Sequence, residues 1–368
     1  MLILDGSHGE GGGALVRTAL ALSTYTGTPF EVFNIRANRP QGGLKAQHLA
    51  TIKALQQLCD AKTSEIQLGS TRFWYHPDTI KKGTFEIEIG TAGSISLLLQ
   101  GLLLPALFAP GKVTFKIKGG TCGKWQASVD YIQQILFPHL QRFARLEMKI
   151  IKRGYYPQGG GEVLLEIHPT NKQPQPLLLT QQGHLEQIRG IINLSQELAE
   201  KEVGERIKKA AEESLRKYEV PINIRVEYVK TPSIGGECVL WAIFSQNQEP
   251  RTFLGGNALI EKNKSSEEIG KEAAEEIQKA LDSEAAVDTH LCDQLIPFLG
   301  LLPGSEILVQ DVSEHAKTNL HITEQFLPVK FVVEGFLERV VTPIGTSAKA
   351  DVPKRFMGKK AYVLILRK

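Results

Sequence analysis

The chain has 368 residues, of which 42% are hydrophobic and 23% are charged, and its formal net charge is +3. This composition is typical of a globular protein of about two domains, and so small a net charge excludes a strongly basic nucleic-acid-binding protein. The four cysteines are far apart and form no C-x-x-C pair, which excludes the usual zinc spacings and indicates free thiols in a reducing cytosol.

The chain shows no targeting or membrane signal. Residues Met1–Gly6 lack a basic segment followed by a long apolar run, so we expect no signal peptide. The most apolar stretch, Ile95–Pro110, is interrupted by Gln100, Gly101 and Pro105, and it is shorter than the roughly 20 residues that span a bilayer. We therefore expect a cytoplasmic protein with no membrane partner.

In the first half of the chain, short β-branched runs alternate with helical patterns, and many of the connections are rich in glycine. The predicted strands are Met1–Leu4, Phe30–Ile35, Thr84–Ile89, Val113–Lys118 and Glu162–His168. The predicted helices are Gly13–Thr24, Leu44–Cys59, Ser94–Leu104 and Ser128–Phe143. This order loosely follows a β-α-β-α-β-β unit, which indicates an α/β fold built from related units.

From about Gly183 the pattern changes. Two charged amphipathic helices, Glu200–Tyr218 and one that begins at Ser265, alternate with the predicted strands Gln187–Leu194, Ile222–Val229 and Val239–Ser245. From Ala285 the earlier pattern returns and continues to a predicted strand at Val329–Glu334. We therefore predict a large domain of residues 1–183 and 281–368, with a smaller α/β domain of residues 184–280 inserted into it.

A glycine-rich segment, Asp5–Gly13, joins the first predicted strand to the first helix. The backbone N–H groups of such a segment can converge on an anion at a helix amino terminus, although a tight turn explains the glycines equally well. Within it, Glu10 is either a solvated loop acid or a carboxylate that holds a divalent cation beside phosphates.

Basic residues follow this segment. Arg17 lies one turn into the first predicted helix, and Arg36, Arg39 and Lys45 come after the second strand. Arginine side chains match phosphate oxygens, and α/β proteins tend to bind ligands beyond the carboxyl ends of strands. The group is therefore either a phosphate or RNA-backbone site or a set of surface charges.

Two polar features interrupt apolar helical patterns. Gln100 is a lone amide in the helix Ser94–Leu104, so it needs a buried partner or a ligand. Asp293 and Gln294, in the segment His290–Gln294, either face a nucleotide pocket or form a polar helix edge.

His315 has the most informative position of the histidines. It follows the apolar run Ile307–Val309 at the predicted start of a helix. Exposed N–H groups at such a position lower the pKa of an imidazole and leave it neutral and nucleophilic. The residue is therefore either a covalent nucleophile or, like other histidines, a structural one.

Taken in order, these segments resemble RNA 3′-terminal phosphate cyclases over nearly the whole chain. The matching motifs are Asp5–Gly13 with Arg17–Leu20, Ile35–Arg39, Gly43–Leu49, Gly93–Gln100, Gly154–Pro157, Asp293–Leu295 and His315–Asn319. The resemblance implies a large domain of three repeated β-α-β-α-β-β units with a smaller inserted α/β domain. The sequence departs from the family pattern at Cys122–Ser128, where the family usually has Asp or Asn followed by prolines.

The resemblance also implies an ATP-dependent enzyme of the ligase class that converts an RNA 3′-terminal phosphate to a 2′,3′-cyclic phosphate. His315 would form a covalent histidine–AMP intermediate, from which AMP would pass to the RNA end. By the same resemblance, ATP would be bound by Gln100, His290, Leu291, Cys292, Asp293 and Gln294. Phosphate and RNA contacts would come from Arg17, Arg36, Arg39 and Gln47, and a divalent metal (magnesium or manganese) would lie near Glu10.

Three alternatives use related features. A catalytically inactive cyclase-like protein of ribosomal RNA processing would lack the nucleophile, and His315 within the H-x-x-T-N motif argues against it. An enolpyruvyl transferase would use related repeats on a small carboxylated substrate without this histidine motif. A simple RNA-binding module would leave Gln100 and Asp293 unexplained.

Overall fold

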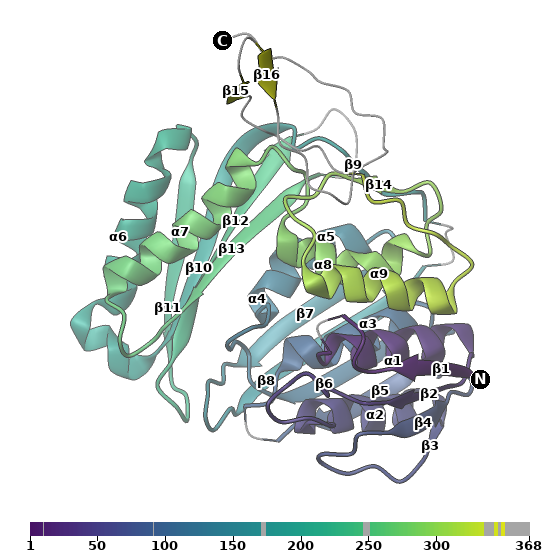
Figure 1. The fold of residues 1–368 in the computed structure, drawn as a ribbon. Helices are drawn as coiled ribbons and strands as arrows, with labels where there is room; N and C mark the ends of the chain where they lie inside the picture. Colours follow the sequence, from purple (N-terminus) through teal and green to yellow (C-terminus); the bar gives the residue numbers. More distant parts are fainter. Residues whose placement is uncertain are drawn as a thin grey trace. The chain divides into compact units, whose positions relative to one another are not determined.

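The structure is a computed structural model that describes residues 1–9, 11–90, 92–170, 174–245, 251–334, 342–344 and 347–349. The chain divides into two compact units, Met1–Val329 and Lys330–Lys368. In the second unit, β15 (Thr342–Ile344) pairs antiparallel with β16 (Ser347–Lys349). The first unit contains the four-stranded sheets drawn in Figure 1.

The first sheet has the strand order β1-β2-β4-β3. Its strands are β1 (Leu2–Asp5), β2 (Phe30–Phe33), β3 (Lys62–Thr63) and β4 (Phe73–His76), and its connecting helices are α1 (Ala14–Thr26) and α2 (Ala46–Cys59). β1 and β2 are parallel, whereas β4 is antiparallel to both β2 and β3.

The second sheet repeats this arrangement in the order β5-β6-β8-β7. Its strands are β5 (Gly83–Glu88), β6 (Val113–Gly119), β7 (Ala144–Lys152) and β8 (Gly161–Pro169). β5 and β6 are parallel, and β8 is antiparallel to both β6 and β7. The first connection is α3 (Ile95–Leu107), and the second contains α4 (Val129–Tyr131), the π-helix η1 (Ile132–Leu136) and α5 (Phe137–Leu140).

The predicted helix Ser128–Phe143 is thus divided into three short helical segments. Pro138 lies in the first turn of α5 and has no N–H to donate, so a single α-helical hydrogen-bond ladder cannot run through this position. The helix predicted here is therefore confirmed over residues 129–140 as three consecutive segments, but the sequence did not indicate the π-helical one.

The third sheet has the order β11-β10-β12-β13 and its own core. Its strands are β10 (His184–Ser195), β11 (Ile222–Val229), β12 (Gly236–Ser245) and β13 (Phe253–Leu259). The helices α6 (Val203–Leu215) and α7 (Ser266–Asp282) lie side by side on one face of this sheet (Figure 1), and the 3₁₀-helices η2 (Gln196–Lys201) and η3 (Arg216–Tyr218) flank α6. The domain boundaries at residues 184 and 280 stay a prediction.

After this sheet the chain forms α8 (Thr289–Leu299) and α9 (Glu314–Phe326), and β14 (Glu306–Ile307) pairs parallel with β9 (Leu178–Leu179). The strand predicted at Val329–Glu334 is not formed. Its β-branched and aromatic residues favour a strand, but no described strand pairs with it there. The fold is therefore mixed α/β, while its division into three equivalent units stays a prediction.

Helices from distant parts of the sequence pack together in the first unit. α1 packs against α3 and α9, and α8 packs against α3 and α9. This packing brings the start of α9 close to α1, as the hydrogen bonds described below show. No helix among the described residues is long and apolar enough to cross a membrane.

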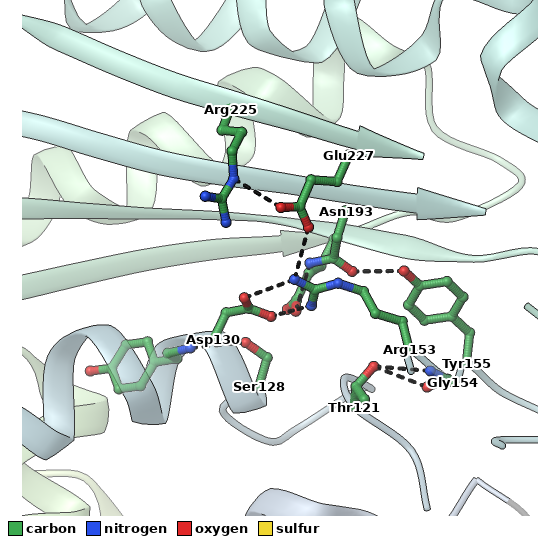
Figure 2. Close-up of polar contacts among 11 residues, drawn as sticks. Thr121, Ser128, Asp130, Arg153, Gly154, Tyr155, Asn193, Arg225 and Glu227 are labelled. Carbon is green, nitrogen blue, oxygen red and sulfur yellow. Dashed lines mark hydrogen bonds and ion pairs between the residues drawn. The ribbon is translucent and has the colours of Figure 1, made fainter. Parts of the chain in front are cut away.

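A buried ion pair lies where the second and third sheets meet. The Arg153 guanidinium donates to both carboxylate oxygens of Asp130, with 3.0 Å from Nη2 to Oδ1, and its Nη2 lies 3.3 Å from Oε2 of Glu227 on β11 (Figure 2). Only 6% of the Arg153 side chain and 3% of the Asp130 side chain are exposed. These charges therefore neutralise each other away from water.

A second chain of hydrogen bonds runs beside this ion pair. The Tyr155 hydroxyl donates to Oδ1 of Asn193 over 2.8 Å, and Nδ2 of Asn193 donates to Oε1 of Glu237 over 3.2 Å. Burial, reinforced by the charge of Asp130, raises the pKa of the Glu237 carboxyl. We call the group Asp130, Arg153, Tyr155, Asn193, Glu227 and Glu237 the Arg153 cluster.

Candidate active site

His315 lies in the first turn of α9, as the sequence predicted. Ser313 caps this helix, because its hydroxyl oxygen accepts a hydrogen bond from the backbone N–H of Ala316 over 2.9 Å. The same hydroxyl donates to Oδ1 of Asp293 on α8. The helix start that carries His315 is therefore fixed to α8.

The rest of the H-x-x-T-N motif fixes α9 to its neighbours. Nδ2 of Asn319 donates to the backbone carbonyl of Asp293 over 2.7 Å, and its Oδ1 accepts a hydrogen bond from Thr18 of α1 over 2.7 Å. Thr318 lies against the glycine-rich segment, where a Cβ on Gly9 would come within 2.6 Å of the Thr318 hydroxyl. These residues position the His315 backbone, which explains why they occur at this spacing.

A cavity of about 300 Å³ opens beside His315. We call it the His315 cavity; it is lined by Gly13, Arg17, Arg36, Arg39, Lys45, Gln47, His48, Ala92, Ser94, Leu97, Lys124, Trp125, Gln126 and His315. It brings together His315 and all four residues expected to contact phosphate or RNA, namely Arg17, Arg36, Arg39 and Gln47. Its described lining includes five Arg and Lys residues and no Asp or Glu, so the wall is strongly cationic.

His48 is a lining residue for which the sequence offered no role. Its Nδ1 accepts a hydrogen bond from the backbone N–H of Lys45 over 2.9 Å. Burial, helped by the charges of Arg17, Arg36 and Lys45, lowers the pKa of His48 to about 3. The ring is therefore neutral with its proton on Nε2, and among the described residues that buried atom has no hydrogen-bond partner.

A second, narrower pocket of about 30 Å³ is lined by Gln100, Asp293 and Gln294 together with Thr18 and Asn319. Oε1 of Gln100 accepts a hydrogen bond from Nε of Arg17 over 2.9 Å, so the buried partner expected for this amide is an arginine of the His315 cavity. Burial raises the pKa of Asp293, although the Ser313 hydroxyl opposes that shift. Such a volume holds only a few water-sized groups.

The other three residues expected to bind ATP are His290, Leu291 and Cys292, and they line neither the His315 cavity nor the narrower pocket. Nε2 of His290 lies 3.0 Å from Oε1 of Glu276 on α7, and this partner raises the pKa of His290 to about 9 against the effect of burial. Leu291 and Cys292 are buried within α8. Of the expected segment, only Asp293 and Gln294 therefore reach the pocket.

The glycine-rich segment lies beside α9. The rings of His8 and His321 stack with their centroids 3.8 Å apart, a contact between two histidines that no sequence pattern suggested. Gly11 has a left-handed φ of 59°, and a Cβ there would come within 2.6 Å of Nδ2 of Asn38. The segment therefore needs glycine for both its conformation and its packing.

The expected metal ligand, Glu10, lies outside the described residues. Among the residues that the structure describes, no group of three His, Cys, Asp or Glu side chains could hold a metal ion. The described His, Cys, Asp and Glu side chains therefore do not form a site that would hold a metal ion without further ligands.

An α/β protein that places a helix-start histidine in a cationic cavity is suited to phosphoryl and nucleotidyl transfer. A family model described as RNA 3′-terminal phosphate cyclase matches residues 8–333. The chain belongs to this family, which confirms the resemblance seen in the sequence. Residues 329–368 also match a second model, described as a putative transposon-encoded protein.

Curated relatives named RNA 3′-terminal phosphate cyclase cover most of the chain. The Pyrococcus abyssi protein is 40% identical over 96% of this chain and 99% of its own length. The Methanosarcina barkeri protein is 42% identical over 91% of this chain and 97% of its own length, and the Methanopyrus kandleri protein is 39% identical over 91% and 96%.

Proposed function

We propose that this protein uses ATP to convert an RNA 3′-terminal phosphate to a 2′,3′-cyclic phosphate through a covalent adenylate on His315. One observation carries the proposal: His315, at the start of α9, shares a cavity with Arg17, Arg36 and Arg39. The family to which the chain belongs supports the same reaction. A cytoplasmic location stays a prediction from the sequence.

The reaction consists of three displacements at phosphorus. A ring nitrogen of His315 attacks the α-phosphorus of ATP, the bond to pyrophosphate breaks, and a phosphoramidate forms. An oxygen of the RNA 3′-phosphate then attacks the adenylate, and the P–N bond breaks to release the histidine. Finally the neighbouring 2′-hydroxyl attacks the activated 3′-phosphorus, loses its proton and expels AMP, which closes the cyclic phosphate.

The cavity residues act mainly on charge and orientation. Each displacement concentrates negative charge on phosphoryl oxygens, which arginine forks can neutralise from fixed positions. Arg17, Arg36, Arg39 and Gln47 would hold the phosphates of ATP and of the RNA end. Oε1 of Gln100 keeps Arg17 in place, and the buried Nε2–H of His48 adds a neutral donor to the same wall.

Gln100, Asp293 and Gln294 are our candidates for contacts with the nucleoside of ATP. Oε1 of Gln294 is buried without a hydrogen-bond partner among the described residues, so it offers an acceptor to an amino group. Because the pocket is narrow, ATP binding requires its walls to move apart. A divalent metal would neutralise triphosphate charge, and a role for Glu10 in holding it stays a prediction.

The alternative of a catalytically inactive cyclase-like protein predicts that no adenylate forms. It is disfavoured because the chain has His315 within the H-x-x-T-N motif, at the start of α9 and in the lining of the cationic cavity, which is the position expected of the nucleophile.

Incubation with α-labelled ATP and a divalent metal tests the proposal. We expect label on the protein that is acid-labile and base-stable, as a phosphoramidate is, and no label on His315→Ala. The matched control is His321→Ala on the same helix, which should retain the label because His321 does not line the cavity. Label that persists on His315→Ala would exclude this histidine as the nucleophile.

The RNA step has a separate readout. An oligonucleotide with a 3′-terminal phosphate should become resistant to phosphatase when wild-type protein and ATP are both present. If the protein is adenylylated but the oligonucleotide stays sensitive, the nucleophile is right and the substrate is wrong.

A further inference from the structure

One large aromatic side chain at the His315 cavity has no structural explanation within the fold. Trp125 lines this cavity, yet 94% of its surface is exposed to solvent. Large aromatic side chains gain most from burial, so an almost fully exposed tryptophan is unusual in a folded chain. A residue that lines a cavity and is this exposed lies at the mouth of that cavity.

The backbone holds Trp125 in this orientation. Its φ of 60° is left-handed, a conformation that bulky side chains rarely adopt and that functional sites often contain. Gly123 packs closely against the Gln126 side chain, because a Cβ there would lie 2.2 Å from Nε2 of Gln126. The exposed ring is thus a product of a specific loop conformation.

The residues on both sides of Trp125 are anchored. Nζ of Lys124 lies 2.9 Å from Oε2 of Glu261, and Oε1 of Gln126 accepts a 3.5 Å hydrogen bond from the Ser96 hydroxyl. Four residues before Trp125, the backbone N–H of Thr121 donates to the carbonyl of Gly154 over 2.9 Å. The loop is therefore fixed at its ends and beside the ring, while the ring itself projects outward.

We propose that Trp125 is a stacking platform for a nucleobase at the 3′ end of the RNA substrate. The proposal rests on the function proposed above and names how that site holds its RNA. Proteins that bind single-stranded RNA combine a cationic surface for the backbone with exposed aromatic rings on which unstacked bases lie. The His315 cavity offers both, because Arg36, Arg39, Lys45 and Lys124 line it together with Trp125.

The RNA base fits this platform better than the adenine of ATP does. Trp125 does not line the narrower pocket of Gln100, Asp293 and Gln294, which we assign to the nucleoside of ATP. A base at the cavity mouth leaves its 3′-phosphate directed inward toward the arginines and His315. Stacking uses the face of the ring without hydrogen bonds, so the platform should accept all four bases.

The test compares Trp125→Ala with wild type in two separate steps. We expect the dissociation constant for an RNA with a 3′-terminal phosphate to rise about tenfold, as loss of one base stack predicts. The rate of adenylylation by ATP alone should not change. Trp125→Phe should keep most of the affinity, and Tyr156→Ala is the matched control, because Tyr156 is an exposed aromatic residue outside the described cavity lining.

An abasic RNA isolates the stacking contact. When the terminal base is removed and the phosphate kept, wild type should lose affinity about as much as Trp125→Ala does, and the variant should lose nothing further. Equal losses in both proteins would overturn the proposal, and so would wild-type affinity of Trp125→Ala for the intact RNA. A raised KM for ATP in the variant, with unchanged RNA binding, would assign the platform to adenine instead.

A measurement of RNA binding tests this inference independently of the proposed reaction. Fluorescence anisotropy of labelled RNA reports binding whether or not His315 becomes adenylylated. Of the three tryptophans of the chain, Trp125 is 94% exposed, Trp74 is half-buried and Trp241 is only 9% exposed, so Trp125 is the most accessible to a quencher. RNA should therefore protect wild-type fluorescence from acrylamide quenching, and this protection should disappear in Trp125→Phe.

Discussion

Two buried arginines of this protein lie in opposite surroundings. Arg153 is 7% exposed and is bound by Asp130 and Glu227, within a cluster that joins two sheets (Figure 2). Arg17 is 6% exposed, donates to the neutral amide of Gln100, and lines a cavity whose described wall has no Asp or Glu. Arg153 is thus bound by carboxylates, whereas Arg17 shares its described cavity wall with Arg36 and Arg39.

From this comparison we predict a structural role for the charge of Arg153 and a phosphate-binding role for the charge of Arg17. Burial of a charge is costly unless a counter-charge compensates it, and the Arg153 cluster supplies that compensation from the chain itself. The wall of the His315 cavity concentrates positive charge, and burial together with Arg39 lowers the pKa of Arg36. An anionic ligand such as a phosphate is stabilised in such a cavity.

The largest effect on stability is expected from Arg153→Met. The substitution leaves the buried Asp130 carboxylate without its cation, which should lower the free energy of unfolding by about 3–5 kcal/mol in denaturant titrations. Arg225→Met is the matched control, because Arg225 also pairs with Glu227 but has 69% of its side chain exposed. The control should cost about 0–1 kcal/mol. Similar losses in the two variants would contradict a structural role that depends on burial.

Arg17→Met should have the reverse effect, namely a large loss of adenylylation rate and a smaller loss of stability. The loss of a cation aimed at developing phosphoryl charge should slow adenylylation by about 10²–10³-fold. Its unfolding free energy should fall less than that of Arg153→Met, by about 1–3 kcal/mol for the acceptor left on Gln100. Arg206→Met, which removes an exposed partner of Glu267 far from the cavity lining, is the control for rate. Unchanged adenylylation in Arg17→Met would remove the distinction between the two arginines.

The sequence predicted most of the helices and strands, but it missed several strands. Short β-branched runs identified strands such as Val113–Lys118, and the parallel pairing of β5 with β6 is consistent with the helix between them. The strand β7 was missed although its residues alternate between buried and exposed, so a stricter count of that pattern could have found it. β13 contains Gly255 and Gly256, which weaken a strand signal, and only the packing of α7 and β12 against it explains its conformation.

The candidate site was predictable where its residues follow strands or begin helices. Arg36, Arg39 and His315 have such positions, and the fold brings them to one cavity. The hydrogen bond from Arg17 to Gln100 crosses 83 positions in sequence, so only the packing of α1 on α3 creates it. For Trp125 a signal existed, namely a tryptophan in a short loop rich in small and polar residues, but its approach to His315 depends on tertiary structure.

The smallest effect is expected from Glu237→Gln, and it tests how the Arg153 cluster balances its charge. Burial and the charge of Asp130 raise the pKa of Glu237 above its ordinary value of 4.5, so the folded state holds a proton that the unfolded state has lost. The stabilising contribution is therefore complete below the ordinary pKa. It declines between the ordinary and the raised pKa, by at most about 1.4 kcal/mol per pH unit, and does not change further above the raised pKa.

Gln at position 237 keeps the oxygen that accepts from Asn193 but cannot ionise. The unfolding free energy of Glu237→Gln should therefore decline less than that of wild type between about pH 4.5 and about pH 8. Glu213→Gln on the exposed side of α6 controls for loss of a carboxylate elsewhere. If Glu237→Gln declined as steeply as wild type, Glu237 would be ionised in the folded protein, and Arg153 would have to balance two buried carboxylates rather than one.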